Sequence, residues 1–400
     1  MRDATLTAIA AALLTAAATH AQTINPPSYR SLELPTLGGQ TASPTDISNT
    51  GWIVGQSTTQ SGFTLPFRYR NGVIQLLGSL PGLTHAGATA VNDAGDVVGT
   101  AASIATLGGA TSQPWLWRNG QFTDLDPFNR GVEAAGRGIN NAGTAAGWLG
   151  ATTTGEIDAF TAVTGTTTLL PLPADDTCHI SRAVDINNAG EVAGYAAPAG
   201  GCGDSQAWVF RAGAVQPLPG LGGRNATPSR INDAGDIVGR DTTPSGTTTA
   251  TLWRLGTPIA LTSPGTTSAA YDINAAGVIV GQYFRPSPQH PVATVWFDLV
   301  PFALSDLTIG GLSLDAATAI NDAGAIVGYG LNANGRSRAF LLTPFCIGDY
   351  NSDGGIDNAD VEAFFREWEG GNFNADLNGD GGIDGSDVQR FFERWEAGRC

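Results

Sequence analysis

Two segments near the end of the chain alternate oxygen-bearing side chains around a glycine. The first spans residues 349–360, and the second repeats its pattern over residues 376–387. In both, Asp or Asn occupies positions 1, 3 and 5, glycine at position 6 allows a sharp turn, and position 7 offers its carbonyl. Calcium prefers roughly six to eight oxygen ligands, so this spacing predicts two Ca²⁺ ions. The predicted ligands are Asp349, Asn351, Asp353, Gly355, Asp357 and Asp360, and then Asp376, Asn378, Asp380, Gly382, Asp384 and Asp387.

An amphipathic helix is expected directly after each of these loops. The apolar positions follow helical spacing: Val361, Phe364, Phe365 and Trp368 after the first loop, and Val388, Phe391, Phe392 and Trp395 after the second. The short stretches before the loops, residues 346–348 and 370–375, leave no room for entering helices. We expect the apolar faces to form a small core of their own.

The loops match the EF-hand pattern, and the duplicated loop and exiting helix resemble a dockerin over residues 349 to about 396. Dockerins attach enzymes to cohesin domains, so the resemblance implies a protein partner that is cohesin-like or lies on a cell surface. The segment 346–400 carries 13 acidic residues against four arginines. Because these acids repel one another without a cation, we expect the segment to be poorly folded until it binds calcium.

The body of the chain is a repeat. A nine-residue phrase with a leading apolar residue, Asn and two glycines occurs seven times. Counted from Asn49 in the first copy and from the first Asn in the others, the spacing is 42 to 48 residues. The copies are Ile47–Gly55, Val91–Gly99, Ile139–Gly147, Ile186–Gly194, Ile231–Gly239, Ile273–Gly281 and Ile320–Gly328.

This period is typical of one four-stranded propeller blade. Asn or Asp followed by glycine between apolar segments predicts a hairpin, which gives the repeated Asn a structural role. The aromatic strands that follow, such as 115–120 and 207–211, are interpreted as blade core rather than as a ligand platform. The last copy lacks its fourth strand, and residues 32–39 are expected to supply it and close the ring.

The sequence therefore predicts a mainly β protein. We expect a signal peptide over residues 1–21, a seven-bladed β-propeller over 22–345 and a small α-helical calcium-binding domain over 346–400. The body resembles the HAF-type extracellular repeat proteins, a likeness carried by residues 34–39 (LPTLGG), the phrase at 231–239 and residues 338–341. That resemblance implies export and a propeller-like fold, and it implies no established catalytic residue.

Composition excludes several chemistries. The net charge of −16 argues against a nucleic-acid partner, and the absence of lysine removes Schiff-base and phosphate-loop lysine chemistry. An apolar stretch over residues 6–18 with a small-residue exit predicts cleavage before Gln22, and no later stretch is long enough for a membrane span. We expect a monomer that is secreted or held on the surface of a bacterium.

Four cysteines allow three disulfide pairings. Cys346 and Cys400 bracket the predicted calcium-binding domain, and Cys178 and Cys202 lie close together in the body, so their positions favour these two pairs. Export makes disulfides permissible, and the spacings are unlike those of zinc sites.

Two functions compete at this point. In one, the propeller is a non-catalytic binding or scaffold module, with glycan among its candidate ligands, attached through the calcium-dependent tail. In the other, the protein is a polysaccharide-active enzyme of the glycoside hydrolase type, which needs two facing carboxylates. Acids outside the tail fall mostly in turns, such as Asp93, Asp233 and Asp322, with scattered candidates at Glu133, Glu156 and Asp158. We favour the binding protein and predict no catalytic residue.

Overall fold

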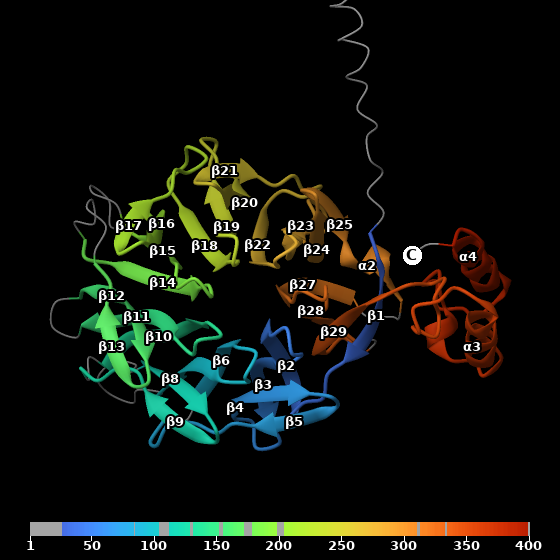
Figure 1. Cartoon of the computed structure of the whole chain (residues 1–400), viewed down its shortest axis with the longest axis horizontal. Coiled ribbons are helices and arrows are strands. Elements are labelled where there is room, and N and C mark those ends of the chain that lie inside the picture. The colour runs from blue at the N-terminus through green and yellow to red at the C-terminus, as the bar shows by residue number, and fades with distance from the viewer. Residues whose placement is uncertain are drawn as a thin grey trace, which may run out of the picture.

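The computed structural model describes residues 26–83, 85–103, 112–128, 131–151, 155–171, 178–197, 204–309, 313–332 and 334–398. Figure 1 shows seven sheets arranged as a ring around a central axis, with two helices beside the ring near its closing blade. The chain is therefore mainly β, and the predicted seven-bladed propeller is confirmed. The predicted signal peptide, residues 1–21, lies outside the described residues.

Six blades are four-stranded sheets whose strands follow one another from the axis outwards. Blade 1 contains β2 (Gly38–Ile47), β3 (Ile53–Thr59), β4 (Thr64–Arg70) and β5 (Val73–Leu76). Blade 2 contains β6 (His85–Val91), β7 (Val97–Ala102), β8 (Ser112–Arg118) and β9 (Gln121–Asp124). Blade 3 contains β10 (Gly131–Ile139), β11 (Ala145–Ala151), β12 (Ile157–Val163) and β13 (Thr166–Leu169). Blade 4 contains β14 (Ser181–Ile186), β15 (Val192–Ala196), β16 (Gln206–Arg211) and β17 (Ala214–Pro217). Blade 5 contains β18 (Ala226–Ile231), β19 (Ile237–Thr242), β20 (Thr248–Arg254) and β21 (Thr257–Ala260). Blade 6 contains β22 (Ser268–Ile273), β23 (Ile279–Phe284), β24 (Pro291–Phe297) and β25 (Val300–Ala303).

Blade 7 closes the ring with strands from both ends of the propeller. Its order is β26 (Thr308–Ile309), β1 (Ser28–Glu33), β29 (Ser337–Phe345), β28 (Ile326–Leu331) and β27 (Ser313–Ile320), and the short helix α2 (Leu304–Leu307) precedes β26. Closure by an N-terminal strand is confirmed, but the predicted range of 32–39 is wrong. The strand is β1, which pairs with β29, whereas Gly38 already begins the first strand of blade 1.

The nine-residue phrase forms the hairpin between the first two strands of each blade, as predicted. Its first glycine has a φ between 77° and 83° in all seven copies, which glycine adopts without strain. At the second glycine a Cβ would lie 2.0 to 2.4 Å from a carbonyl oxygen of the first strand in every copy, and in four copies it would also meet an aromatic ring. At Gly194, a Cβ would lie 2.2 Å from Cζ2 of Trp208 and 2.4 Å from the carbonyl oxygen of Arg182. This close approach explains why glycine recurs at that position.

The aromatic residues of the third strands are blade core, as predicted. Trp115, Trp208, Trp253 and Trp296 are fully buried, each between its own blade and a neighbour. Such side chains bury a large apolar area and stabilise the contacts between blades. The core is thus divided into seven similar clusters around the ring.

The tail contains helices α3 (Asn358–Glu369) and α4 (Gly385–Glu396), with the 3₁₀ helix η1 (Phe373–Ala375) between them. Phe364 and Phe391 stack in parallel at their centre, 4.5 Å apart. This core continues into blade 7 through Ile309 and Phe345. The expected amphipathic helices are therefore present, but their core also includes residues of the propeller.

Candidate functional site

A buried arginine lies in the central channel and contacts aspartates from three other blades. In every first strand the pairing register shifts two residues before the hairpin, and such a bulge re-aims the side chain that follows it. The residues at this position are Asp46, Ala90, Gly138, Asp185, Arg230, Asp272 and Ala319. One position thus carries three acids and one base around the axis.

Arg230 of blade 5 forms ion pairs with all three acids. Its Nη2 lies 3.0 Å from Asp46 Oδ1, its Nη1 lies 3.4 Å from Asp185 Oδ1, and its Nε lies 3.8 Å from Asp272 Oδ1. Each acid also accepts a backbone N–H from the following blade, from Val91, Ile231 and Ile320 respectively. The cluster therefore connects blades 1, 4, 5 and 6 to one another and to their neighbours.

The three acids are at most 9% exposed, so the environment controls their ionisation. Burial raises the pKa of Asp272 to about 7, although the charge of Arg230 lowers it. Burial raises the pKa values of Asp46 and Asp185 in the same way. For Arg230, burial alone would lower the pKa, but the three carboxylates raise it above its ordinary value. Arg230 is therefore a permanent cation, and its ion pairs with the three buried acids link the blades around the channel.

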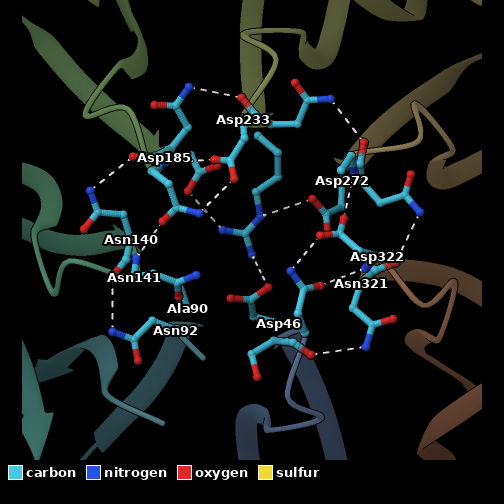
Figure 2. A pocket seen from close by; sticks show the side chains of 18 of the residues that line it. Asp46, Ala90, Asn92, Asn140, Asn141, Asp185, Asp233, Asp272, Asn321 and Asp322 are labelled. Atoms are coloured by element: carbon cyan, nitrogen blue, oxygen red, sulfur yellow. Dashed lines mark hydrogen bonds and ion pairs between the residues drawn. The ribbon is translucent and has the colours of Figure 1, made fainter. Parts of the chain in front are cut away.

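A ring of asparagine side chains surrounds the narrow end of the channel (Figure 2). Each amide nitrogen donates to the equivalent carbonyl of the next blade at 3.1 to 3.2 Å, from Asn92, Asn140, Asn187, Asn232, Asn274 and Asn321. In all six, the oxygen of the same side chain accepts the N–H that lies four residues later in its hairpin. Asn is required because it donates and accepts at once.

The ring is open at one place. In blade 1 the structural counterpart of these asparagines is Ser48, because Gly51 donates to the carbonyl of Ser48 as Gly95 does to that of Asn92. The sequence alignment that placed Asn49 in this role is therefore wrong by one residue. Asn49 belongs to a second, outer set with Asp93 and Asp322, in which amides pair with carboxylates of adjacent blades.

The structural role predicted for the repeated Asn is thus confirmed and extended. The side chain does not only stabilise its own turn, since it also bonds to the next blade. The turn acids named in the sequence take part as well, because Asp93 accepts from Asn49 and Asn141, and Asp233 accepts from Asn188. Glu133 pairs with Arg182 and is itself 64% exposed.

On the other side of Arg230 the channel widens into a cavity of about 400 Å³. Arg230 lines both spaces and so separates them. The wide cavity is bordered by the extra residue inside each bulge, which directly precedes the position of Asp46 and Arg230 in its first strand. It is also bordered, in four blades, by the residue that follows the second glycine of the phrase. Its larger side chains are Arg137, Trp148, Tyr195, Arg240, Tyr271 and Tyr329.

Two features of this cavity stand out. Arg137 and Arg240 are solvent-accessible within the channel, and in the described part of the chain neither takes part in an ion pair or hydrogen bond. Burial raises the pKa of Tyr271 to about 12 and also raises that of Tyr329, so both phenols are neutral at physiological pH. The cavity therefore combines neutral aromatic rings with unpaired cations.

Sequence reasoning missed both the buried cluster and the wide cavity. The signal for the cluster was present, because Asp-Ile or Arg-Ile stands directly before the turn at 46–47, 185–186, 230–231 and 272–273. The signal for the cavity is a position that varies where its neighbours repeat: Gln56, Thr100, Trp148, Tyr195, Arg240, Gln282 and Tyr329. Their convergence depends on ring closure, which a linear pattern does not display.

The two predicted calcium loops adopt nearly the same conformation. In the first, Asp349 accepts N–H groups from Asp353 and Gly354, and Asp360 accepts from Asn351 and Asp357. In the second, the corresponding acids are Asp376 and Asp387, and they accept from the matching region of their own loop. Each loop ends in a capping box at the start of its helix.

The two halves of the tail also brace each other. Trp368 of α3 donates its indole N–H to the carbonyl of Asp384 at 3.1 Å, and Trp395 of α4 donates to the carbonyl of Asp357 at 2.9 Å. Each loop is thus held by the helix that follows the other loop. Tyr350 joins the pair to η1, with its hydroxyl 3.0 Å from Glu367 Oε2 and 3.1 Å from the carbonyl oxygen of Asn374.

The donor set of these loops fits calcium in its chemistry. Asp360 and Asp387 are fully buried, and none of the ion pairs formed by the described residues includes them. Both oxygens of Asp360 and the Oδ2 of Asp387 accept one N–H each, so each keeps a lone pair for a cation, whereas the Oδ1 of Asp387 accepts two N–H groups. However, among the described residues no three Asp, Glu, His or Cys side chains converge as a metal cluster. The loops offer the right atoms, and their carboxylates hold backbone N–H groups.

The predicted disulfides involve residues at the limits of the structure. Cys202 and Cys400 lie outside the described residues, while neither Cys178 nor Cys346 is a free thiol. The pairing therefore stays a prediction. Over the described ranges no helix is both long and apolar enough to span a membrane.

The fold and channel define a seven-bladed β-propeller. No protein-family model and no curated protein matches the chain. Among solved structures, it is similar to an acylaminoacyl peptidase from Pyrococcus horikoshii at 11% identity, over 72% of this chain and 50% of the peptidase, with a TM-score of 0.47. It is similar to TolB from Acinetobacter baumannii at 10% identity, over 78% of this chain and 65% of TolB, with a TM-score of 0.39.

A third similar structure is AofleA from Arthrobotrys oligospora, at 14% identity over 71% of this chain and 92% of that one, with a TM-score of 0.40. Likenesses of this degree concern the propeller fold alone. They leave ligand and activity to be argued from the residues of this chain.

Proposed function

We propose that this is a secreted, non-catalytic binding or scaffold protein whose propeller is an interaction platform and whose dockerin-like tail attaches it, in a calcium-dependent way, to a surface or complex. The tail carries the proposal. Two loops with the same twelve-residue donor pattern are cross-braced by Trp368 and Trp395, so that ordering one loop supports the other. Calcium bound by these loops supplies the positive charge that the acidic segment lacks.

The position of the tail supports attachment. Its core includes Phe345 and Ile309 of blade 7, and Arg30 of β1 lies 3.6 Å above the ring of Phe345 and 4.7 Å above that of Tyr350. A module packed on the closing blade leaves the channel of the propeller available to another ligand. Secretion and a HAF-type relationship are supported by the N-terminal pattern and the LPTLGG and Ile-Asn phrases.

A non-catalytic role is supported by the acids that do converge. Asp46, Asp185 and Asp272 are buried around Arg230 and hold backbone groups of adjacent blades, so their oxygens are engaged in structure. A glycosidase instead needs a carboxylate pair that faces its substrate. No observation in the channel favours the glycoside hydrolase alternative.

Calcium titration of the full chain tests the proposal. We expect isothermal calorimetry to give two Ca²⁺ ions per chain, and chelation to lower the helical circular dichroism signal, because α3 and α4 lose the ions that offset their acidic loops. Asp349→Ala with Asp376→Ala should abolish both effects. Asp298→Asn, an exposed residue in the turn between β24 and β25 of blade 6, is the control.

The partner is tested with the same variants. The full chain should be retained on cohesin-bearing or cell-surface material in calcium and released by chelator, whereas the double variant should not be retained. A helical signal that chelator leaves unchanged, or no saturable calcium binding at about 1 mM, the weak limit for extracellular calcium modules, would contradict the proposal.

A further inference from the structure

The wide cavity of the channel encloses two arginines without a carboxylate partner. Arg137 comes from β10 in blade 3 and Arg240 from β19 in blade 5, and within the described ranges neither forms an ion pair or hydrogen bond. Both side chains are exposed to solvent within the cavity, and the positive charge of Arg230 acts on Arg137. A cation in such a place is stabilised by an anion from outside.

Aromatic rings occupy the same part of the cavity. Trp148 lies beside Arg137, whose guanidinium carbon is 5.7 Å from the indole centre, and Tyr195, Tyr271 and Tyr329 line the wall further round. The indole nitrogen of Trp148 is buried and has no hydrogen-bond partner among the described residues. Flat apolar faces next to a guanidinium group suit a ring-shaped ligand that also carries polar atoms.

Three threonines on the opposite wall of the cavity determine which polar groups the ligand must carry. Thr45, Thr89 and Thr318 line the cavity, and each hydroxyl is 2.8 to 3.0 Å from a carbonyl of the adjacent blade, to which it donates. A hydroxyl that has given its only proton can only accept from a ligand. The ligand must therefore bring O–H or N–H donors to this wall, which a sulfate ion does not have.

We propose that the wide cavity binds a sugar acid, a hexuronate unit whose carboxylate faces Arg137 and Arg240, whose ring packs on Trp148 and the tyrosines, and whose hydroxyls donate to the threonine wall. The inference rests on the proposed role of the propeller as a binding platform. A volume of about 400 Å³ is within the range of small-molecule sites, roughly 300–1,000 Å³. The unit is either a free monosaccharide or the end of an acidic polysaccharide.

Calorimetric titration of the full chain with D-glucuronate, D-glucose and sulfate tests this assignment. We expect glucuronate to bind at least tenfold more tightly than either other probe, since glucose lacks the charge and sulfate lacks the donors. Arg137→Gln and Arg240→Gln should each weaken glucuronate binding by about tenfold, the loss of one charge-assisted contact. Neither arginine forms an ion pair or hydrogen bond with a described residue, so both variants should melt close to the parent. Arg224→Gln, at a side chain 82% exposed, is the control.

A second arm identifies the source. If an oligogalacturonide binds more tightly than the monosaccharide, and the arginine variants weaken both, the site receives a chain end; equal affinity indicates a free sugar acid. The proposal is overturned if wild-type protein shows no saturable glucuronate binding at about 10 mM, enough to reveal a Kd near 1 mM. It is also overturned if glucose or sulfate binds equally, or if the arginine variants bind unchanged.

Failure here is distinguishable from failure of the proposed function. If the chain is retained on a polysaccharide or protein surface and Arg137→Gln has no effect, the proposed binding role of the propeller is supported and the proposed sugar-acid site is refuted. If calcium neither binds nor alters retention, the tail proposal falls, and glucuronate titration still gives its own answer.

Discussion

Replacing Arg230 by Met should be among the most destabilising single changes in the propeller. The variant keeps an unbranched, flexible side chain and removes the charge that pairs with Asp46, Asp185 and Asp272 at 3.0, 3.4 and 3.8 Å. Removing one partner of a buried ion pair costs about 3–5 kcal/mol, because the remaining charge is uncompensated. Since three acids lose one partner, we expect a loss in the upper half of that range at pH 8.

The pH dependence of this loss follows from the sign of the pKa shifts. In the parent, burial already raises the pKa of Asp272 to about 7, and the charge of Arg230 lowers the pKa of all three acids. Without Arg230 the folded-state pKa values rise further, while those of the unfolded chain stay near 4. The folded variant then binds protons that the unfolded chain releases. Its stability therefore falls as pH rises, and the deficit should be small at pH 5 and complete at pH 8.

Urea denaturation followed by tryptophan fluorescence at pH 5, 6, 7 and 8 measures the effect. The matched control combines Arg230→Met with Asp46→Asn, Asp185→Asn and Asp272→Asn, because an amide can still accept the backbone N–H of the next blade. This variant should regain most of the lost free energy. A deficit for Arg230→Met below about 1 kcal/mol at pH 8, or one that does not change with pH, would refute the reasoning.

Three further changes test separate parts of the structure. Asp272→Asn should flatten the dependence of the unfolding free energy on pH between 5 and 8. The parent loses stability as pH rises from the pKa of Asp272 in the unfolded chain to its folded pKa of about 7, whereas an amide does not titrate. An unchanged slope would contradict this. Gly194→Ala should cost on the order of 3 kcal/mol in urea denaturation, since its Cβ meets Trp208 at 2.2 Å, whereas Gly190→Ala, with open space around it and strained only in its φ, should cost about 1–2 kcal/mol. Equal costs would refute the packing argument. Trp395→Phe should raise amide exchange in α3 about fivefold, the loss of about 1 kcal/mol of bracing, and exchange limited to α4 would show that the halves are not coupled.

The parts of the fold that the sequence predicts are those that each repeat specifies locally. A hairpin needs Asn and a glycine with positive φ wherever it occurs, so seven phrases predict seven hairpins and, with their period, seven blades. Apolar and aromatic strands pack next to them in sequence. The range of β1 was misplaced because residues 32–39 resemble the outer-strand phrase of other repeats, whereas pairing is set by the long strand β29.

The channel was not predictable in the same way. Asp46 and Arg230 lie four repeats apart in the chain, and they meet only because the ring closes. Their residue types gave a weak signal, since an acid before a turn is common on any surface. Calcium ligation remains a prediction for a related reason: the loop pattern specifies the donor atoms, but the ion that would gather them is external to the chain.

A closed ring of repeats imposes a limit on its own symmetry. Suppose that the position after the bulge, which Asp46 and Arg230 occupy, held the same residue in every blade. Seven identical side chains would then face one axis, and if they were charged they would repel one another strongly because they are buried. The chain instead places three acids, one arginine and small residues there, and Gly138 leaves the space that Asp185 enters, since a Cβ at Gly138 would lie 2.6 Å from Asp185 Oδ1.

The same reasoning applies to the wide cavity. Positions that repeat in all blades are explained by the hairpin, the blade core and the asparagine ring, and each of these is satisfied within the fold. The position after the second glycine differs in kind between blades: Trp148, Tyr195 and Arg240 lie on blades 3 to 5, Tyr329 lies on blade 7, and Gln56, Thr100 and Gln282 occupy the other blades. No requirement of the blade explains an unpaired arginine beside an aromatic ring. The side chains that differ between blades and face the axis are therefore the ones that we expect to recognise a ligand.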